Sequence, residues 1–315
     1  AQLKDYSQCN NLAFDSSDIS YYTNLYKNIL ERNPSTMEIV DLAQCNSEHS
    51  RHWFFNGIMN IGDYRDTKSL MDYIKEPLQV NPNNSAIAFK DNASAIQTFE
   101  PVIDLVPSRV DQTSPYKLKE VCYLPTLNAE THNFPTGICP FPGASTGVGG
   151  RIRDTQSIGR GGMPVAGLAG YCVGEISDTP RPELLHTAEN ILLKASNGAS
   201  DYGNKFGEPI IGGFCRHYRG KTLLYPRKFE EREWIKPIMF SAGIGKVRDE
   251  SVIKPKPEIG MKVCKLGGPA YRIGIGGGSA SSRSGAQGDT DLSAVQRGDA
   301  EMENRLNRVI RSLVE

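Results

Sequence analysis

Apolar residues recur at helical spacing near both ends of the chain. They predict a helix from Ser17 to Leu30 with Ser17 as its cap, and a second helix from Met37 to Ala43 that Asn33 caps and Pro34 begins. Residues 302–313 form a third amphipathic helix, capped by Asp299. Residues 1–16 are polar and are expected to be irregular.

Apolar and β-branched runs between these helices predict strands. The runs cover residues 86–90, 121–124, 166–176, 238–247 and 261–266. An apolar stripe from Leu184 to Ala195 predicts a further helix that ends at Asn197-Gly198. Residues 77–84 are rich in turn formers, and prolines at 101, 107 and 115 predict a long loop. The pattern is that of a mixed α/β protein.

Composition excludes several classes of function. With 315 residues the chain is long enough for two domains, and 36 basic residues balance 36 acidic ones, so no overall charge attracts nucleic acid or a membrane surface. No apolar run approaches the roughly 20 residues of a membrane span, and the first residues do not resemble a signal peptide. Seven scattered cysteines, an odd number, argue against a disulfide framework and indicate the reducing cytoplasm.

The stretch from Asn128 to Asp154 carries the densest candidate chemistry. It contains Glu130, His132 and a glycine-rich segment that ends in arginines and Asp154. Glycines and arginines suit phosphate, and carboxylates suit Mg²⁺. The segment lacks the Lys-Ser/Thr ending of a P-loop, and it follows prolines rather than the strand that a dinucleotide fingerprint requires. Residue chemistry alone leaves a phosphate loop and a plain surface turn equally open.

Two other segments invite a site but favour simpler interpretations. His49 and His52 lie close together without a third ligand nearby in sequence, which favours a polar loop over a metal site. Residues 274–279 imitate a dinucleotide motif, but Ser279 occupies the third glycine position. A turn at a domain interface explains that segment better.

Longer motifs resemble those of the phosphoribosylformylglycinamidine synthase family, in its large single-chain form. The motifs are Glu-Thr-His-Asn-Phe-Pro-Thr-Gly (130–137), Gly-Ala-Ser-Thr-Gly-Val-Gly-Gly-Arg-Ile-Arg-Asp (143–154), and the runs 42–55, 195–209, 267–282 and 295–299. They follow the family order over nearly the whole chain. Because the chain stops on its last predicted helix, we expect it to be a segment of a longer enzyme.

The resemblance implies a fold and a domain plan. The fold would be an α/β unit of the aminoimidazole ribonucleotide synthetase type, whose N-terminal sheets pair into a barrel. It implies a helical linker domain over residues 1–50, a synthetase N-terminal domain over 51–255 and the start of its C-terminal partner over 256–315. A second synthetase half and the glutaminase domain would be partners outside this sequence. The chain alone is therefore expected to lack glutamine hydrolysis, and it need not turn over.

The resemblance also assigns site residues. Glu130 and Asp154 would bind Mg²⁺, His132 would be the catalytic acid or base with His49 as second choice, and Thr131, Asn133, Phe134 and Arg153 would contact substrate. Residues assigned to ATP are Gly143, Ala144, Ser145, Thr146, Gly147, Val148, Gly149, Gly150, Arg151, Ile152, Arg153, Asp154, a turn at Gly212, Gly213 and Phe214, and His52. Small family members usually have tyrosine at the position of His52, and many relatives have histidine at that of Phe134.

The implied reaction converts formylglycinamide ribonucleotide, ATP and ammonia from glutamine to formylglycinamidine ribonucleotide, ADP and phosphate. It is the fourth step of purine biosynthesis, and ATP would phosphorylate the substrate amide oxygen to make it a leaving group. Two rivals remain. Another ATP-using member of the superfamily, such as a selenophosphate synthetase-like enzyme, is disfavoured because no cysteine lies in a glycine-rich N-terminal loop. A non-catalytic nucleotide-binding module is disfavoured by Glu130, His132 and Asp154.

Overall fold

The chain divides into two compact units in a computed structural model. The structure describes residues 2–10, 12, 14–46, 53–82, 84–177, 181, 185–224, 227–267, 292 and 295–314. Unit 1 comprises residues 1–82, 182–184 and 270–294, and unit 2 comprises 83–181, 185–269 and 295–315. The first boundary between the units in the sequence therefore lies between residues 82 and 83. The domain limits at 50 and 255 remain predictions.

Unit 1 begins with helices that pack around Leu12, Ile39 and Ala43. These helices are α1 (Gln2–Cys9), α2 (Ser16–Asn24), the π-helix η1 (Leu25–Ile29) and α3 (Thr36–Cys45). The prediction that residues 1–16 are irregular is wrong, because α1 occupies half of them. The predicted caps are wrong as well: Asp15 and Ser35 cap α2 and α3, each in a capping box with the residue three positions on.

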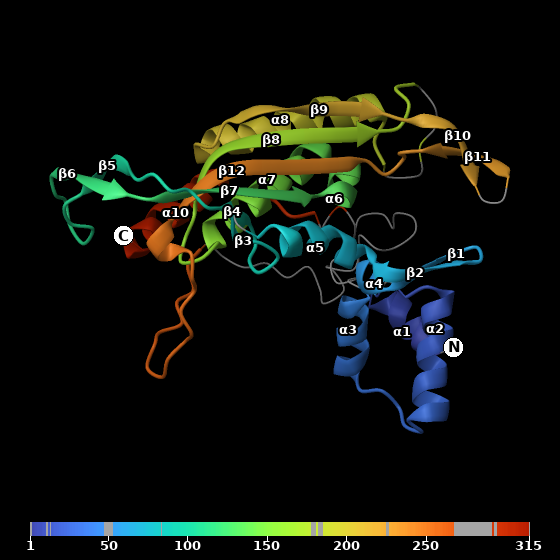
Figure 1. Cartoon of the computed structure of the whole chain (residues 1–315). Coiled ribbons are helices and arrows are strands. Elements are labelled where there is room, and N and C mark those ends of the chain that lie inside the picture. Colours follow the sequence, from blue (N-terminus) through green and yellow to red (C-terminus); the bar gives the residue numbers. More distant parts are fainter. Residues whose placement is uncertain are drawn as a thin grey trace. The chain divides into compact units, whose positions relative to one another are not determined.

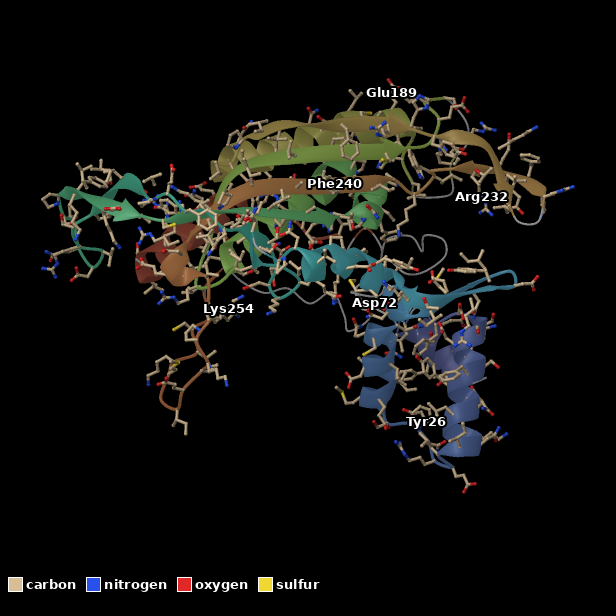
Figure 2. The ribbon with its side chains drawn as sticks, in the orientation of Figure 1. Tyr26, Asp72, Glu189, Arg232, Phe240 and Lys254 are labelled. Carbon is tan, nitrogen blue, oxygen red and sulfur yellow. The ribbon has the colours of Figure 1, made fainter. Side chains whose placement is uncertain are left out.

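Residues 53–80 of unit 1 form a short helix, a hairpin and a longer helix. These are α4 (Trp53–Asn56), β1 (Ile58–Ile61), β2 (Tyr64–Ser69) and α5 (Leu70–Val80). Ser69 and Asp72 form the capping box that begins α5, and Figure 2 labels Asp72. The turn-rich joint predicted over 77–84 starts too early, because α5 continues through Pro77 to Val80. Proline has no backbone N–H, but at this position only the last turn of the helix lacks that hydrogen-bond donor.

Unit 2 is built on a six-stranded sheet with the order β3-β4-β7-β12-β8-β9 (Figure 1). Its strands are β3 (Ser85–Ile87), β4 (Ser94–Ile96), β7 (Tyr123–Thr131), β8 (Met163–Val173), β9 (Ile210–His217) and β12 (Ile238–Arg248). All pairings are antiparallel except that of β8 with β9. The structure therefore confirms the strands predicted near residues 86, 121, 166 and 238.

Helices cover one face of this sheet. They are α6 (Asn133–Ile138), α7 (Pro140–Ser157), α8 (Ala188–Phe206) and α10 (Ala300–Val314). A core that includes Val148, Ile191 and Met239 joins α7, α8 and α10 to the strands. Within unit 2 the opposite face leaves Leu127, Ile244 and Phe214 between 41% and 51% exposed. Phe214 packs against Phe240 on this face with ring centroids 5.7 Å apart (Phe240 in Figure 2).

Several predicted segments of unit 2 differ from the structure. The predicted long loop contains the hairpin of β5 (Val102–Pro107) and β6 (Tyr116–Val121), since its prolines lie at strand ends or outside the strands. A second hairpin joins β10 (Arg219–Leu224) to β11 (Lys228–Glu233), and a short 3₁₀ helix η2 spans Asp249–Ser251. The predicted buried strand over 261–266 is wrong, because those residues are exposed and irregular. The final helix and its Asp299 cap are confirmed.

Helix α8 does not end at Asn197-Gly198 as predicted. It continues to Phe206 and stops at Gly207, whose left-handed φ of 99° ends the helix. Gly198 serves packing instead, because a Cβ there would lie 2.2 Å from the carbonyl oxygen of Phe141 on α7.

Gly198→Ala is therefore expected to lower the free energy of unfolding by about 1–3 kcal/mol, the usual cost of overpacking. Urea denaturation measures it. Gly150→Ala is the matched control: its Cβ would meet only the Arg153 side chain at 3.7 Å, so helix propensity should stabilise that variant by about 0.5–1 kcal/mol. Equal effects of the two substitutions would contradict the packing role of Gly198.

Candidate functional site

The glycine-rich segment is a helix rather than a phosphate loop. Residues 143–154 lie within α7, so neither the phosphate loop nor the surface turn considered for this segment is formed. Its glycines allow close packing: a Cβ on Gly143 would lie 2.6 Å from the Pro135 backbone, and one on Gly149 would lie 2.6 Å from the Tyr202 ring. Apart from Gly150, residues 143–152 are buried, which leaves Arg153 and Asp154 as the charged side chains of this segment within reach of a ligand.

Arg151 cannot reach a ligand from its position in the core. Its guanidinium and the Glu208 carboxylate form a bidentate ion pair whose two side chains are both 0% exposed. Burial raises the pKa of Glu208, and the charge of Arg151 opposes that rise. The pair links α7 to the residues that follow α8, so its role in unit 2 is structural.

Two carboxyl groups meet at the end of β7. Glu130 is the penultimate residue of that strand, and its carboxyl lies close enough to that of Asp154 on α7 for the two to interact electrostatically. Asn92, in the connection between β3 and β4, donates to Asp154 Oδ1 at 3.1 Å. Partial burial and the negative charge of Asp154 raise the pKa of Glu130. Carboxyls in such contact need a shared proton or a cation between them.

This pair suits Mg²⁺. The described residues contain no group of three or more His, Cys, Asp or Glu side chains arranged to hold a metal. Mg²⁺ does not require one, since it commonly takes one or two carboxylates and completes its shell with water and substrate phosphates. Glu130 and Asp154 supply the two hard oxygen ligands that such a site needs.

The raised pKa of Glu130 predicts a dependence of stability on pH. The folded protein holds this proton above the ordinary pKa of 4.5, where the unfolded chain has lost it. The free energy of unfolding should therefore fall as the pH rises from 4.5 through the raised pKa, and Mg²⁺ should oppose that fall. Denaturant titrations across this range, with and without Mg²⁺, measure it. Glu130→Gln should remove this fall in the free energy of unfolding and the effect of Mg²⁺ on it. The same pH dependence of stability in Glu130→Gln and the wild type would contradict the assignment of the proton to Glu130.

His132 directly follows β7 and precedes α6. Its Nδ1 lies 2.5 Å from the carbonyl oxygen of Gly143. Because a carbonyl oxygen only accepts hydrogen bonds, Nδ1 carries the hydrogen, and Nε2 is the basic nitrogen of the neutral ring. The backbone of α7 thus fixes the orientation and tautomer of the histidine.

The neighbouring predicted substrate residues differ in their surroundings. Thr131 is exposed at the strand end. Asn133 accepts a hydrogen bond from the Met239 backbone through Oδ1, which ties α6 to β12. Phe134 is buried, with Lys236 Nζ 5.8 Å from its ring centroid. Of these three, Thr131 is the one most open to a ligand.

Other predicted nucleotide residues lie elsewhere. Gly212, Gly213 and Phe214 belong to strand β9, so the predicted turn at this point is wrong. These three residues pair with β8 and are exposed. His49 and His52 lie outside the described residues.

Structure adds two features that the sequence did not reveal. Ser241 pairs with Glu130 across β12 and β7, and its buried hydroxyl has no hydrogen-bond partner in the described part of the chain. Glu303 on α10 accepts from Arg153 at 3.0 Å and from the Tyr202 hydroxyl. Burial and the charge of Glu303 raise the pKa of Tyr202. These contacts join residues about 100 or more positions apart, which no local pattern could indicate.

The sequence is similar to known enzymes of purine biosynthesis that bear the same name. A family model for the formylglycinamide ribonucleotide amidotransferase linker domain matches residues 3–52. Phosphoribosylformylglycinamidine synthase of Dictyostelium discoideum is 52% identical over 96% of this chain and 23% of its own length. The Homo sapiens protein of that name is 48% identical over the same shares. The chain is thus similar in sequence to phosphoribosylformylglycinamidine synthases over nearly all of its own length. It spans about a quarter of the length of these relatives.

Solved structures agree on the fold. The chain aligns over 94% of its length with 37% of T. maritima PurL complexed with FGAR, with a TM-score of 0.54 and 23% identity. T. maritima PurL complexed with ATP gives a TM-score of 0.50 at 21% identity, over 35% of that chain. The predicted mixed α/β fold of the aminoimidazole ribonucleotide synthetase type is confirmed.

Proposed function

We propose that this chain forms part of an active site that converts formylglycinamide ribonucleotide to formylglycinamidine ribonucleotide, with ATP and with ammonia from glutamine. The observation that carries the proposal is the meeting of Glu130 and Asp154 at the end of β7, with an oriented His132 two residues beyond Glu130. The names of the relatives, and the FGAR and ATP complexes of T. maritima PurL, support these substrates.

In this proposal Glu130 and Asp154 would hold Mg²⁺, which would supply positive charge to offset that of the ATP phosphates. The γ-phosphoryl group of ATP is transferred to the amide oxygen of the substrate, and ADP leaves. Ammonia then adds to the activated carbon, and phosphate leaves with the former amide oxygen. His132 Nε2 accepts the proton that the incoming nitrogen loses, while the Nδ1–H bond to Gly143 keeps the ring in place.

Arg153 is the proposed contact for substrate phosphate or for the transferring group. Its side chain is 47% exposed, and Glu303 holds one arm of the guanidinium at 3.0 Å. Asn133 would contact substrate through its side-chain amide nitrogen, because its Oδ1 already accepts a hydrogen bond from the Met239 backbone.

The proposed partners are the second synthetase half and a glutaminase. The apolar face of the unit 2 sheet, with Leu127, Ile244 and Phe214 exposed, supports pairing with another sheet.

Among the described residues no helix has the length and apolar character to cross a membrane. The cytoplasm is the proposed compartment, because all seven cysteines are free. One relative, from Arabidopsis thaliana, is named as a chloroplastic/mitochondrial protein.

The metal assignment is tested by Glu130→Ala. We expect it to abolish the Mg²⁺-dependent part of the binding of a non-hydrolysable ATP analogue and to leave the Mg²⁺-independent part unchanged. Calorimetric titration with and without Mg²⁺ separates the two. Glu120→Ala, which removes an exposed carboxylate from β6, is the control and should behave as the wild type. Mg²⁺-dependent binding that persists in Glu130→Ala would rule out the assignment.

A further inference from the structure

The two arginines of helix α7 are held by carboxylates in different ways. Arg151 and Glu208 are both 0% exposed, which fits a pair that only supports the fold. Arg153 pairs with Glu303 in the first turn of α10, and the two partners differ: the glutamate side chain is 5% exposed and the arginine side chain is 47% exposed. The anchor of this second pair lies in the core, whereas the charged group that it holds is open to solvent.

The first turn of α10 fixes the position of Glu303. Asp299 caps the helix and accepts from the Met302 backbone at 2.9 Å. Asn304, the next residue along, donates through Nδ2 to the carbonyl oxygen of Phe206 at the end of α8, at 2.7 Å. A side chain on a turn that is held at both ends keeps its place, so the flexible arginine has to adapt to the carboxylate.

Tyr202 fixes the same carboxylate from α8. Its hydroxyl donates to Glu303 Oε2, the oxygen that also accepts from Arg153 Nη1 at 3.0 Å. The Tyr202 ring lies between two glycines, since a Cβ on Gly149 would be 2.6 Å from it and one on Gly298 would be 2.9 Å from it. Burial raises the pKa of Tyr202, and the guanidinium of Arg153 lies close enough to oppose that rise. The three side chains therefore form one connected group.

The stability of the fold does not account for a carboxylate at this position. Glu303 Oε1 is buried and has no hydrogen-bond partner among the residues that the structure describes. Burial raises the pKa of Glu303, against the hydrogen bond from Tyr202 and the charge of Arg153. A buried carboxylate with an unsatisfied oxygen costs stability, and apolar side chains would join α10 to α7 at lower cost. The effect of the carboxylate on Arg153 explains the arrangement better.

We propose that Glu303 is a positioning residue for Arg153, and that it holds the guanidinium ready for a phosphate oxygen of the substrates. The inference rests on the substrate contact proposed for Arg153 above. A free arginine side chain samples many rotamers and loses that freedom when it binds a ligand. Fixing Nη1 in advance removes part of that loss, while the exposed remainder of the guanidinium can still donate to phosphate. Because Tyr202 donates to the same oxygen of Glu303, the carboxylate charge is shared and offsets that of the arginine only in part.

The test is the kcat/KM for formylglycinamide ribonucleotide of a complete enzyme that contains this segment, with ammonia as the nitrogen source. Glu303→Met should lower kcat/KM about tenfold or more, because it removes the charge-assisted hydrogen bond to Arg153. Glu303→Gln keeps an acceptor of similar shape without the charge and should lower it only about threefold. In an Arg153→Met background neither substitution should lower it further, since no guanidinium remains to be positioned. Should Glu303→Met not fold, by circular dichroism, Glu303→Gln completes the same comparison.

Asn304→Ala is the matched control. It removes a side-chain hydrogen bond that ties the same turn of α10 to α8 but does not involve Arg153, so it should keep the wild-type kcat/KM. A loss of kcat/KM in Asn304→Ala as large as that in Glu303→Met would mean that the docking of α10 matters rather than the position of the arginine. That result would overturn the proposal, as would Glu303 variants whose effects add fully to that of Arg153→Met.

Arg153→Met alone separates this inference from the proposed function. If that variant keeps the wild-type kcat/KM, the substrate contact assigned to Arg153 is wrong and the role of Glu303 falls with it. If Arg153→Met lowers kcat/KM while the Glu303 variants behave as the wild type, the substrate contact stands and only the positioning role is refuted.

Discussion

Arg151→Met is expected to destabilise the protein more than any other substitution considered for this chain. It removes one partner of a buried ion pair and leaves Glu208 in the core without its counter-ion. Breaking such a pair costs about 3–5 kcal/mol. Because burial already raises the pKa of Glu208, that carboxyl should become protonated in the variant. Urea denaturation followed by circular dichroism measures the loss.

The double variant Arg151→Met/Glu208→Leu is the control. With both charges replaced by apolar side chains, no uncompensated charge remains, and much of the lost stability should return. Arg305→Met, which removes an exposed ion pair with Glu301 on α10, should cost less than about 1 kcal/mol. An Arg151→Met variant as stable as Arg305→Met would show that the buried pair does not support the fold.

His132→Ala should have the largest effect on turnover. In a complete enzyme that contains this segment, loss of the proposed proton acceptor should lower kcat about 100- to 10,000-fold. Substrate binding should change much less, since the imidazole acts on the incoming nitrogen. Steady-state kinetics with ammonia in place of glutamine isolates this step from glutamine hydrolysis.

His217→Ala provides the comparison for that experiment. His217 is an exposed residue at the end of β9, and its removal should leave kcat unchanged. The acidic limb of the pH–rate profile should also disappear in His132→Ala if His132 must be neutral to accept a proton. A variant that keeps both the wild-type kcat and that limb would assign the proton transfer to another residue.

Elements whose burial follows a simple period were predictable from sequence. Strand β7 alternates buried and exposed positions from Leu124 to Ala129, and β12 is largely apolar from Ile238 to Ile244. Helix α10 has one apolar stripe and a recognisable cap at Asp299. In these elements local pattern and tertiary burial agree, so periodicity identifies them.

Helix α7 was not predictable in this way. Its glycines suggest a loop by local propensity, because glycine costs about 1 kcal/mol in a helix relative to alanine. Tertiary contacts override that preference: Gly143, Gly147 and Gly149 each meet another segment where a Cβ would lie within 3 Å of its atoms. Sequence alone cannot distinguish glycines that approach a phosphate from glycines that approach a neighbouring chain segment.

The site was predictable in part. The motif places Glu130 and His132 at the end of a strand, and the structure brings Asp154 to Glu130 from α7. The partners of these residues were not foreseeable. Arg151 pairs with Glu208, which lies 57 positions further along the chain, and Arg153 pairs with Glu303, 150 positions further. Both pairings depend on how α7, α8 and α10 pack.

Calorimetric titration of this chain with formylglycinamide ribonucleotide, with and without Mg²⁺ and a non-hydrolysable ATP analogue, tests the central claim most directly. The account predicts saturable binding that tightens when Mg²⁺ and the analogue are present, and that weakens in Arg153→Met but not in Arg232→Met, an exposed arginine of β11. Absence of binding for both ligands, or binding that is unchanged in Arg153→Met and Glu130→Ala, would contradict the assignment of this end of the sheet as the active site.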